Sequence, residues 1–191
     1  QDYVTIFSTD HVWDTNWKCL TENFMESYHL PVAHKATVGG HYTPSETEFD
    51  PHGAFDAFTY QMFTKSDGAP VGRAHDTNTR LQGRARYTSV MPTIFPSHMY
   101  VLAPDHLWYL ALQPDGPSRT RIRYGAAIAP EVLAAQDDRD AFIARTRAFL
   151  DVVQQEDKGV VEGIFRGAQS PLGESGPLSW LERENHEFTQ Y

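Results

Sequence analysis

The sequence has 191 residues. Since a domain has roughly 150 residues, this length predicts a single domain. Hydrophobic residues make up 40% and charged residues 21%, a composition that excludes a disordered, collagen-like or coiled-coil chain. The formal charge of -9 disfavours nucleic acid as a partner, because an acidic surface repels a phosphate backbone. No apolar run is long enough to span a membrane and residues 1–10 lack a signal-peptide pattern, so we expect a cytoplasmic protein with no membrane partner.

The first predicted element is a helix over residues 14–30. Its apolar and aromatic residues recur at helical spacing: Trp17, Leu20, Phe24 and Tyr28. Pro31 cannot donate a backbone hydrogen bond and disfavours the helical conformation in the residue before it. We therefore expect the helix to end or kink between His29 and His34.

The middle of the chain, residues 54–129, predicts β structure. Its candidate strands are separated by short turns rich in Pro, Asp and Gly, and cover residues 54–64, 97–103, 106–113 and 119–129. In the last of these, three arginines alternate with Thr120, Ile122 and Tyr124, the period expected of a sheet with one solvated and one buried face. Short turns favour an antiparallel meander, whose buried face needs a cover.

A long amphipathic helix over residues 138–166 supplies that cover. It follows an acidic Asp137-Asp138 pair, which suits a helix N-terminus, and closes near Gly167. Its apolar stripe consists of Phe142, Ile143, Phe149, Leu150, Val153, Val160, Val161 and Ile164. Strands followed by a covering helix predict an α+β fold.

Asp157 lies at the centre of this apolar stripe, within about 60° of its nearest apolar neighbours on the helical wheel. An unpaired ionised carboxylate there would cost several kcal/mol. Asp157 must therefore be neutralised, hydrogen-bonded, ion-paired or bound to a metal. An arginine or tyrosine from the sheet would satisfy it as well as a metal would.

His29 and His34 are the candidates for completing a metal site. On an uninterrupted helix, residues five apart diverge by about 140°, but a break at Pro31 would let the second ring swing toward the first. Two imidazoles and one carboxylate form the facial triad of non-haem Fe(II) oxygenases. The alternatives are two unrelated histidines near a helix end, or a three-histidine zinc site that includes His41 and would leave Asp157 unexplained.

Three segments carry a recognisable pattern of motifs. They are Asn16–Lys18 with Glu22–His29 and His34; Gln155–Asp157 with Glu162, Arg166 and Gly167; and Gly176–Ser179 with Glu182 and Phe188. Together they span nearly the whole chain. This pattern resembles the catalytic domain of Rieske-type aromatic-ring-hydroxylating oxygenase alpha subunits.

The resemblance implies that His29, His34 and Asp157 bind mononuclear Fe(II). It also implies a helix-grip (START/Bet v1-like) fold, in which an antiparallel sheet wraps around a long C-terminal helix. Glu26 falls where the family carries an acidic residue that bridges the iron to the electron-donating cluster, and Asn23 is a further candidate site residue. Members that act on quaternary amines, of the choline and carnitine type, tend to have Glu at the position of Glu26; otherwise Glu26 would be a solvated helix-face carboxylate.

One departure from the family is large. Its members carry an N-terminal Rieske domain whose 2Fe-2S cluster needs two cysteines and two histidines, whereas Cys19 is the single cysteine here. We therefore expect residues 1–191 to be one mononuclear-iron catalytic domain without its Rieske domain, either a fragment of a longer chain or a partner of a separate subunit. Electrons would come from an external Rieske cluster or a ferredoxin and reductase, and a homotrimer is the assembly that the resemblance implies.

The expected function is O2-dependent hydroxylation of an aromatic compound, or oxidative demethylation or hydroxylation of a quaternary amine. The alternatives are a zinc-dependent hydrolase and a non-catalytic small-ligand-binding module of the same fold. Four aromatic and sulfur-containing sheet residues are candidate walls of the substrate pocket: Phe95, Met99, Tyr100 and Trp108.

Overall fold

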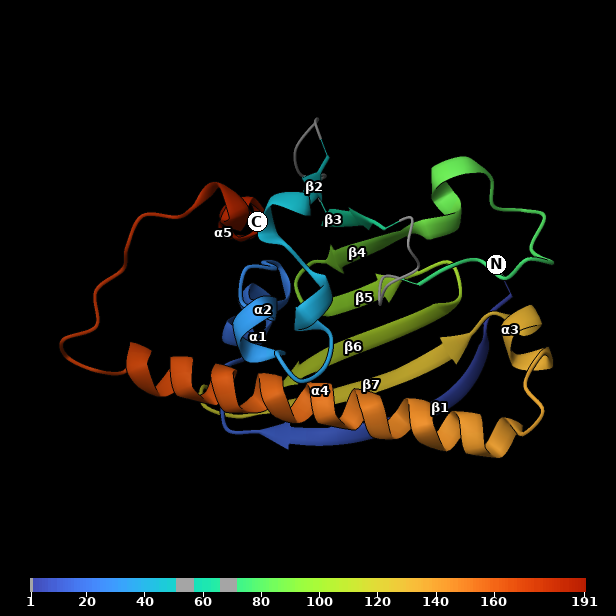
Figure 1. Cartoon of the computed structure of the whole chain (residues 1–191). Helices are drawn as coiled ribbons and strands as arrows, with labels where there is room; N and C mark the ends of the chain where they lie inside the picture. The colour runs from blue at the N-terminus through green and yellow to red at the C-terminus, as the bar shows by residue number, and fades with distance from the viewer. Residues whose placement is uncertain (1, 51–56, 66–71) are drawn as a thin grey trace.

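The computed structural model describes residues 2–50, 57–65 and 72–191. Its centre is a seven-stranded antiparallel sheet crossed on one face by a long helix (Figure 1). The strands are β1 (Val4–Trp13), β2 (Glu48–Phe49), β3 (Phe58–Thr64), β4 (Thr88–Ile94), β5 (His98–Leu102), β6 (His106–Pro114) and β7 (Thr120–Ile128). Their order is β1-β7-β6-β5-β4-β3-β2, so β2 to β7 form a meander and β1 adds to its far edge.

The predicted meander is therefore confirmed. The first predicted strand begins at Phe58, and residues 54–56 lie outside the described part. In β7 the alternation holds: Thr120, Ile122 and Tyr124 are fully buried, while the intervening arginines point to solvent. The sequence analysis did not predict β1, which pairs with β7 along its whole length.

The helices are α1 (Trp17–Phe24), α2 (Leu30–Ala33), α3 (Pro130–Ala134), α4 (Arg139–Ala168) and α5 (Arg183–Gln190). Short 3-10 turns lie at η1 (Gly39–His41), η2 (Pro44–Glu46), η3 (Gly83–Tyr87) and η4 (Trp180–Glu182). In Figure 1, α1 and α2 lie beside α4, and the chain after α4 returns to place α5 near β3. Among the described residues, no helix combines the length and the apolar character that a membrane span requires.

The single helix predicted over residues 14–30 is wrong. The helix ends at Phe24, and the N–H of the next residue, Met25, donates hydrogen bonds to the carbonyls of Thr21 and Glu22. Pro31 does not break a helix but begins the next one, because its missing N–H costs nothing in a first turn. The chain reversal between α1 and α2 thus lies before His29 rather than after it.

Helix α4 matches its prediction within two residues at its C-terminal end. The Asp138 carboxylate accepts a hydrogen bond from the Ala141 N–H and caps the helix. Of the apolar stripe, only Val153 and Val161 are buried. Phe149, in the middle of the stripe, is 45% exposed and lines a cavity, and Ile164 at its C-terminal end is 51% exposed.

The main core lies where α1 and α4 meet the sheet. It consists of Trp13, Leu20, Phe24, Met99, Leu110, Leu112, Ile122, Tyr124 and Val161. A second cluster of Met25, Phe95 and Phe188 fixes α5. Asp157 is one turn before Val161 on α4, so this core holds the acidic side chain in place.

Glu184 gives a test of this packing. Its side chain on α5 is fully buried, and neither carboxylate oxygen has a hydrogen-bond partner among the described residues. Burial, together with the charge of Glu187, raises the pKa of Glu184 well above its usual range. The unfolded chain releases the proton of Glu184 as the pH rises above about 4.5, whereas the folded chain keeps it up to the raised pKa of Glu184. Between these two pKa values the free energy of unfolding falls as the pH rises.

We predict that Glu184→Gln stabilises the protein by about 1–3 kcal/mol near neutral pH. The difference in the free energy of unfolding between the variant and the unsubstituted protein should vanish when the pH is below the usual glutamate pKa. Urea unfolding at several pH values measures it, with exposed Glu174→Gln as the control. A difference that does not depend on pH would contradict this account of Glu184.

Candidate metal centre

His29, His34 and Asp157 lie together in the structure. Each offers one ligand atom, and these atoms all lie within 4.8 Å of one another. The Nε2 atom of His34 is 3.0 Å from Asp157 Oδ1, and Nε2 of His29 is 3.6 Å from the same oxygen. The two rings are 5.3 Å apart at their centroids. Two histidines from one segment thus meet a carboxylate that lies more than a hundred residues later.

Helix α2 brings the two rings together. His29 caps its N-terminus and His34 its C-terminus, and the single turn between them is closed by the bond from the His34 N–H to the Leu30 carbonyl. Gly39 then packs on this turn: a Cβ at this position would lie 2.0 Å from the Leu30 oxygen and 2.8 Å from that of His34. The rings converge because they cap one short helix, not because a long helix kinks at Pro31.

The outer nitrogen of each ring is held by a second carboxylate. Glu26 binds Nδ1 of His29 with one oxygen and accepts the His29 backbone N–H with the other, at 3.1 Å. Glu156 binds Nδ1 of His34 at 2.9 Å. Carboxylates in this position fix the tautomer and orientation of metal-binding imidazoles. Both rings are thereby left with Nε2 directed at Asp157.

Glu156 is a site residue that the sequence analysis missed. It precedes Asp157 on α4, and the roughly 100° step between neighbouring helical residues lets the pair reach the two nitrogens of His34. The Thr37 hydroxyl donates to the same Glu156 oxygen at 2.6 Å. Its position next to Asp157 could have indicated a role at the site. Because Glu156 lies off the apolar stripe, however, the helical pattern predicts an ordinary surface residue.

Asn23 contacts the third member of the centre. Its Nδ2 donates to Asp157 Oδ1 at 3.1 Å, and the side chain is buried. Asn23 therefore orients the carboxylate that the two imidazoles face. Tyr28, next to His29, instead donates to Glu182 at the surface and is 41% exposed.

The charges of the centre depend on one another. Burial lowers the pKa of His29, but hydrogen bonds with Asp157 and Glu26 raise it to about 9. Burial likewise opposes the charge on His34, and its bonds to Asp157 and Glu156 raise the pKa of that ring. Burial raises the pKa of Asp157, whereas the two histidines lower it to about 2. Asp157 is thus an anion that attracts positive charge between itself and the rings.

This donor set fits a divalent metal ion. Two imidazole nitrogens and a carboxylate, each held by a further hydrogen bond, are the ligand types of non-haem iron sites; His34 and Asp157 are buried and His29 is half-buried. Among the described residues Asp157 contacts Asn23, His29 and His34, and no arginine or tyrosine of the sheet pairs with it. His41 is exposed and is not part of the cluster found among the described residues.

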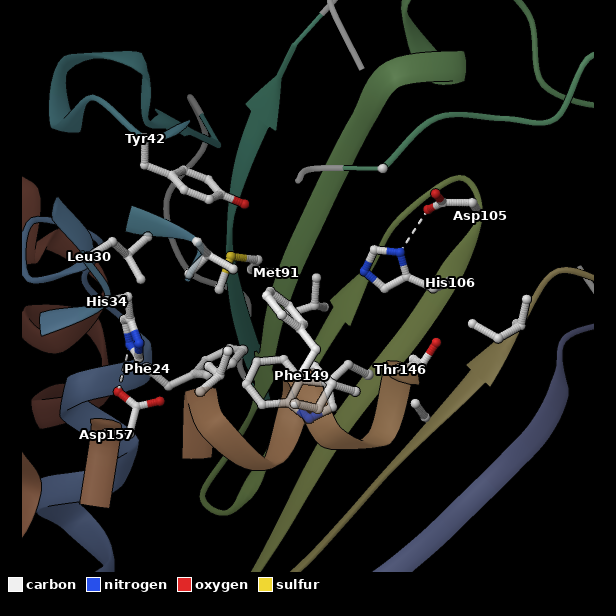
Figure 2. A pocket seen from close by; sticks show the side chains of 18 of the residues that line it. Phe24, Leu30, His34, Tyr42, Met91, Asp105, His106, Thr146, Phe149 and Asp157 are labelled. Carbon is white, nitrogen blue, oxygen red and sulfur yellow. Dashed lines mark hydrogen bonds and ion pairs between the residues drawn. The ribbon is translucent and has the colours of Figure 1, made fainter. Parts of the chain in front are cut away.

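The three residues lie at one end of a cavity of about 580 Å³ (Figure 2). Phe24, Leu30 and Met91 line it near the triad, and Phe149 of α4 projects into its middle. Of the four predicted wall residues, only Trp108 lines the cavity. Phe95 and Met99 belong to the core instead, and Tyr100 is not a lining residue. A largely apolar cavity of this size suits a small organic molecule.

The chain was compared with families and proteins already characterised. Residues 2–191 match the family described as ring hydroxylating alpha subunit (catalytic domain). A chloroplastic choline monooxygenase of Arabidopsis thaliana is 27% identical over 180 residues, which cover 94% of this chain and 39% of that protein. The chain therefore spans about two fifths of the length of this relative.

Solved structures of Rieske oxygenases share the fold. A quaternary ammonium Rieske monooxygenase, described with carnitine oxidation and inter-subunit electron transfer, has a TM-score of 0.69 at 16% identity, covering 98% of this chain and 48% of its own. Dicamba monooxygenase bound to 3,6-dichlorosalicylic acid has a TM-score of 0.69 at 17% identity, covering 98% and 57%. The predicted helix-grip-like antiparallel fold is confirmed.

The fold and the converging donor set define the class of an α+β helix-grip domain with a candidate metal centre. The match over nearly the entire length places the chain in a particular family within that class. This chain belongs to the catalytic domains of ring-hydroxylating oxygenase alpha subunits, whose characterised members are Rieske non-haem iron enzymes.

The role of Glu156 can be tested by metal affinity. We predict that Glu156→Gln weakens Fe(II) binding by about 10–100-fold, the usual effect of removing a carboxylate that orients a ligating histidine. Anaerobic titration of the protein with Fe(II) measures the change. Asp151→Asn on the same helix, where Asp151 pairs with Arg147 at the surface, is the matched control. Equal affinity in both variants would show that Glu156 does not orient His34.

Proposed function

We propose that residues 1–191 form the catalytic domain of a non-haem Fe(II) oxygenase, with His29, His34 and Asp157 as the iron ligands. The observation that carries this proposal is the convergence of two imidazole Nε2 atoms on one buried carboxylate at the end of an apolar cavity. Membership of the ring-hydroxylating family supports it.

The proposed reaction is O2-dependent hydroxylation of an aromatic compound, or oxidative demethylation or hydroxylation of a quaternary amine. Relatives described as choline and dicamba monooxygenases support both substrate classes. When bound, Fe(II) supplies the activation of O2, with electrons from an external donor. Asn23, Glu26 and Glu156 orient the ligands, and the apolar walls place the substrate beside them and exclude water.

We propose that electrons enter through Glu26. Its buried carboxylate binds Nδ1 of His29, whereas Nε2 of the same ring faces Asp157, so Glu26 is in direct contact with a proposed iron ligand. One cysteine cannot hold a Rieske cluster, so the partner is a 2Fe-2S Rieske domain, or a ferredoxin with its reductase, in a homotrimer. The description of inter-subunit electron transfer in a structural relative supports this arrangement.

A cytoplasmic location stays a prediction, and the Arabidopsis relative is a chloroplastic protein by name.

The two alternative functions, a zinc hydrolase and a non-catalytic module, predict different metal chemistry. A zinc site would bind zinc in stoichiometric amount with a water in the open position. A non-catalytic module would bind no metal under anaerobic Fe(II) loading.

The metal assignment is tested by anaerobic loading with Fe(II) followed by nitric oxide. We predict one iron per chain and the paramagnetic resonance signal of an iron-nitrosyl complex, because the triad leaves coordination positions open. Asp157→Ala should lose both the iron and the signal, whereas Asp151→Asn should keep both. Iron retained in full by Asp157→Ala would refute the assignment.

The role of Glu26 is tested separately. We predict that Glu26→Gln, loaded at a saturating concentration of Fe(II) because loss of the carboxylate weakens the site, slows substrate-dependent O2 consumption at least 100-fold when a reduced Rieske protein is the donor. Measuring iron content alongside the rate separates transfer from binding. An unchanged rate in the iron-loaded variant would exclude Glu26 from the electron path.

A further inference from the structure

The cavity has a second polar end, remote from the triad. In Figure 2, Asp105 and His106 lie on the opposite side of the cavity from His34 and Asp157, with Thr146 of α4 below them. Thr146 and Asp157 are eleven residues apart on one face of α4, which places them about 17 Å apart along the helix axis. Between the two ends the lining is mainly apolar.

Asp105 and His106 form a fixed pair at this end. His106 Nδ1 and Asp105 Oδ1 are 2.7 Å apart, and each side chain is about 30% exposed. Burial raises the pKa of Asp105, but hydrogen bonds from His106 and from the Arg73 backbone lower it. Asp105 thus occupies Nδ1, and Figure 2 shows the other ring nitrogen directed into the cavity.

The backbone around the pair is shaped to hold it. Gly72 has φ +86°, and a Cβ there would lie 2.2 Å from Asp105 Oδ1. The Asp105 carbonyl in turn accepts the backbone N–H of Ala129 at the end of β7. Asp105 is therefore held from both sides, and His106 at the start of β6 has little freedom to turn away from the cavity.

Arg145 adds a cation to the same end. It lines the cavity from α4, one residue before Thr146, and within the described part of the chain no carboxylate pairs with it. Arg147, two residues later, contrasts with it, because Arg147 pairs with Asp151 and lies over the Phe7 ring on another face of the helix. Arg145 is thus an exposed cation in the cavity wall, with no carboxylate partner among the described residues.

We propose that Arg145, His106 and Thr146 bind the carboxylate of an elongated, otherwise apolar organic acid whose far end is placed at the triad. A guanidinium and a hydroxyl donate hydrogen bonds to a carboxylate. Because Nδ1 of His106 already donates to Asp105, Nε2 donates to the bound carboxylate only when the ring carries a proton on both nitrogens. The apolar walls between the two ends match the body of such a molecule. The acid can be aromatic or a long betaine, since both present the same carboxylate to this end.

This inference rests on the proposed function and names its substrate class. It also separates this chain from its choline-oxidising relatives, because choline carries no carboxylate and is too short to bridge the two ends. The carbon that is oxygenated then lies at the end of the substrate remote from its acid group.

Binding to the full chain loaded anaerobically with Fe(II) tests the proposal by calorimetry. The probes are phenylvalerate, its amide phenylvaleramide, trimethylammoniovalerate and choline. We expect phenylvalerate to bind at least tenfold more tightly than its amide, as expected for one charge-assisted contact, and choline to bind weakest. The relative affinity of the aromatic acid and the betaine identifies which body the apolar walls accept.

Arg145→Gln should weaken phenylvalerate about tenfold and leave the amide unchanged, whereas Arg147→Gln should change neither. Equal binding of acid and amide, equal weakening of both by Arg145→Gln, or choline as the tightest ligand would overturn the proposal. These outcomes are distinct from failure of the oxygenase assignment, which shows instead as absence of bound iron before any probe is added.

Discussion

The site depends on one buried negative charge. Asp157 lies on the inner face of α4, next to the core residues Val153 and Val161, where an unpaired carboxylate would cost several kcal/mol. The chain compensates this charge with two imidazoles and an amide from the other end of the sequence. Under the proposed function, the same imidazoles and carboxylate hold a metal ion, which replaces the ring protons as the positive charge beside Asp157.

The rest of the fold positions these side chains around Asp157. The sheet gives α4 a surface on which its central turns are buried; α1 packs against both the sheet and α4, and α2 packs against α4. Because α4 runs on for about five further turns beyond Asp157 toward its N-terminus, the space between helix and sheet extends into a long cavity. The candidate metal centre at one end, built from α2 and α4, and the Arg145 and His106 groups at the other, on α4 and β6, thus share one helix.

Much of this arrangement could be predicted from the sequence. The 3.6-residue period placed Asp157 in an apolar stripe, and the alternation in β7 identified a half-buried strand, because both signals are local. The course of the chain between His29 and His34 was not predictable in the same way: Pro31 is compatible with ending one helix or starting another, and tertiary contacts of Gly39 decide between them. Glu156, Asp105 and Arg145 were missed because each is an ordinary surface-type residue until distant elements give it a partner or a cavity.

The most direct test of the central claim is a crystal structure of the Fe(II)-loaded chain, prepared without oxygen, with anomalous diffraction recorded at the iron edge. The account predicts a single iron peak in contact with Nε2 of both histidines and a carboxylate oxygen of Asp157. An iron peak elsewhere, or Asp157 hydrogen-bonded to other groups with no iron beside it, would contradict the account.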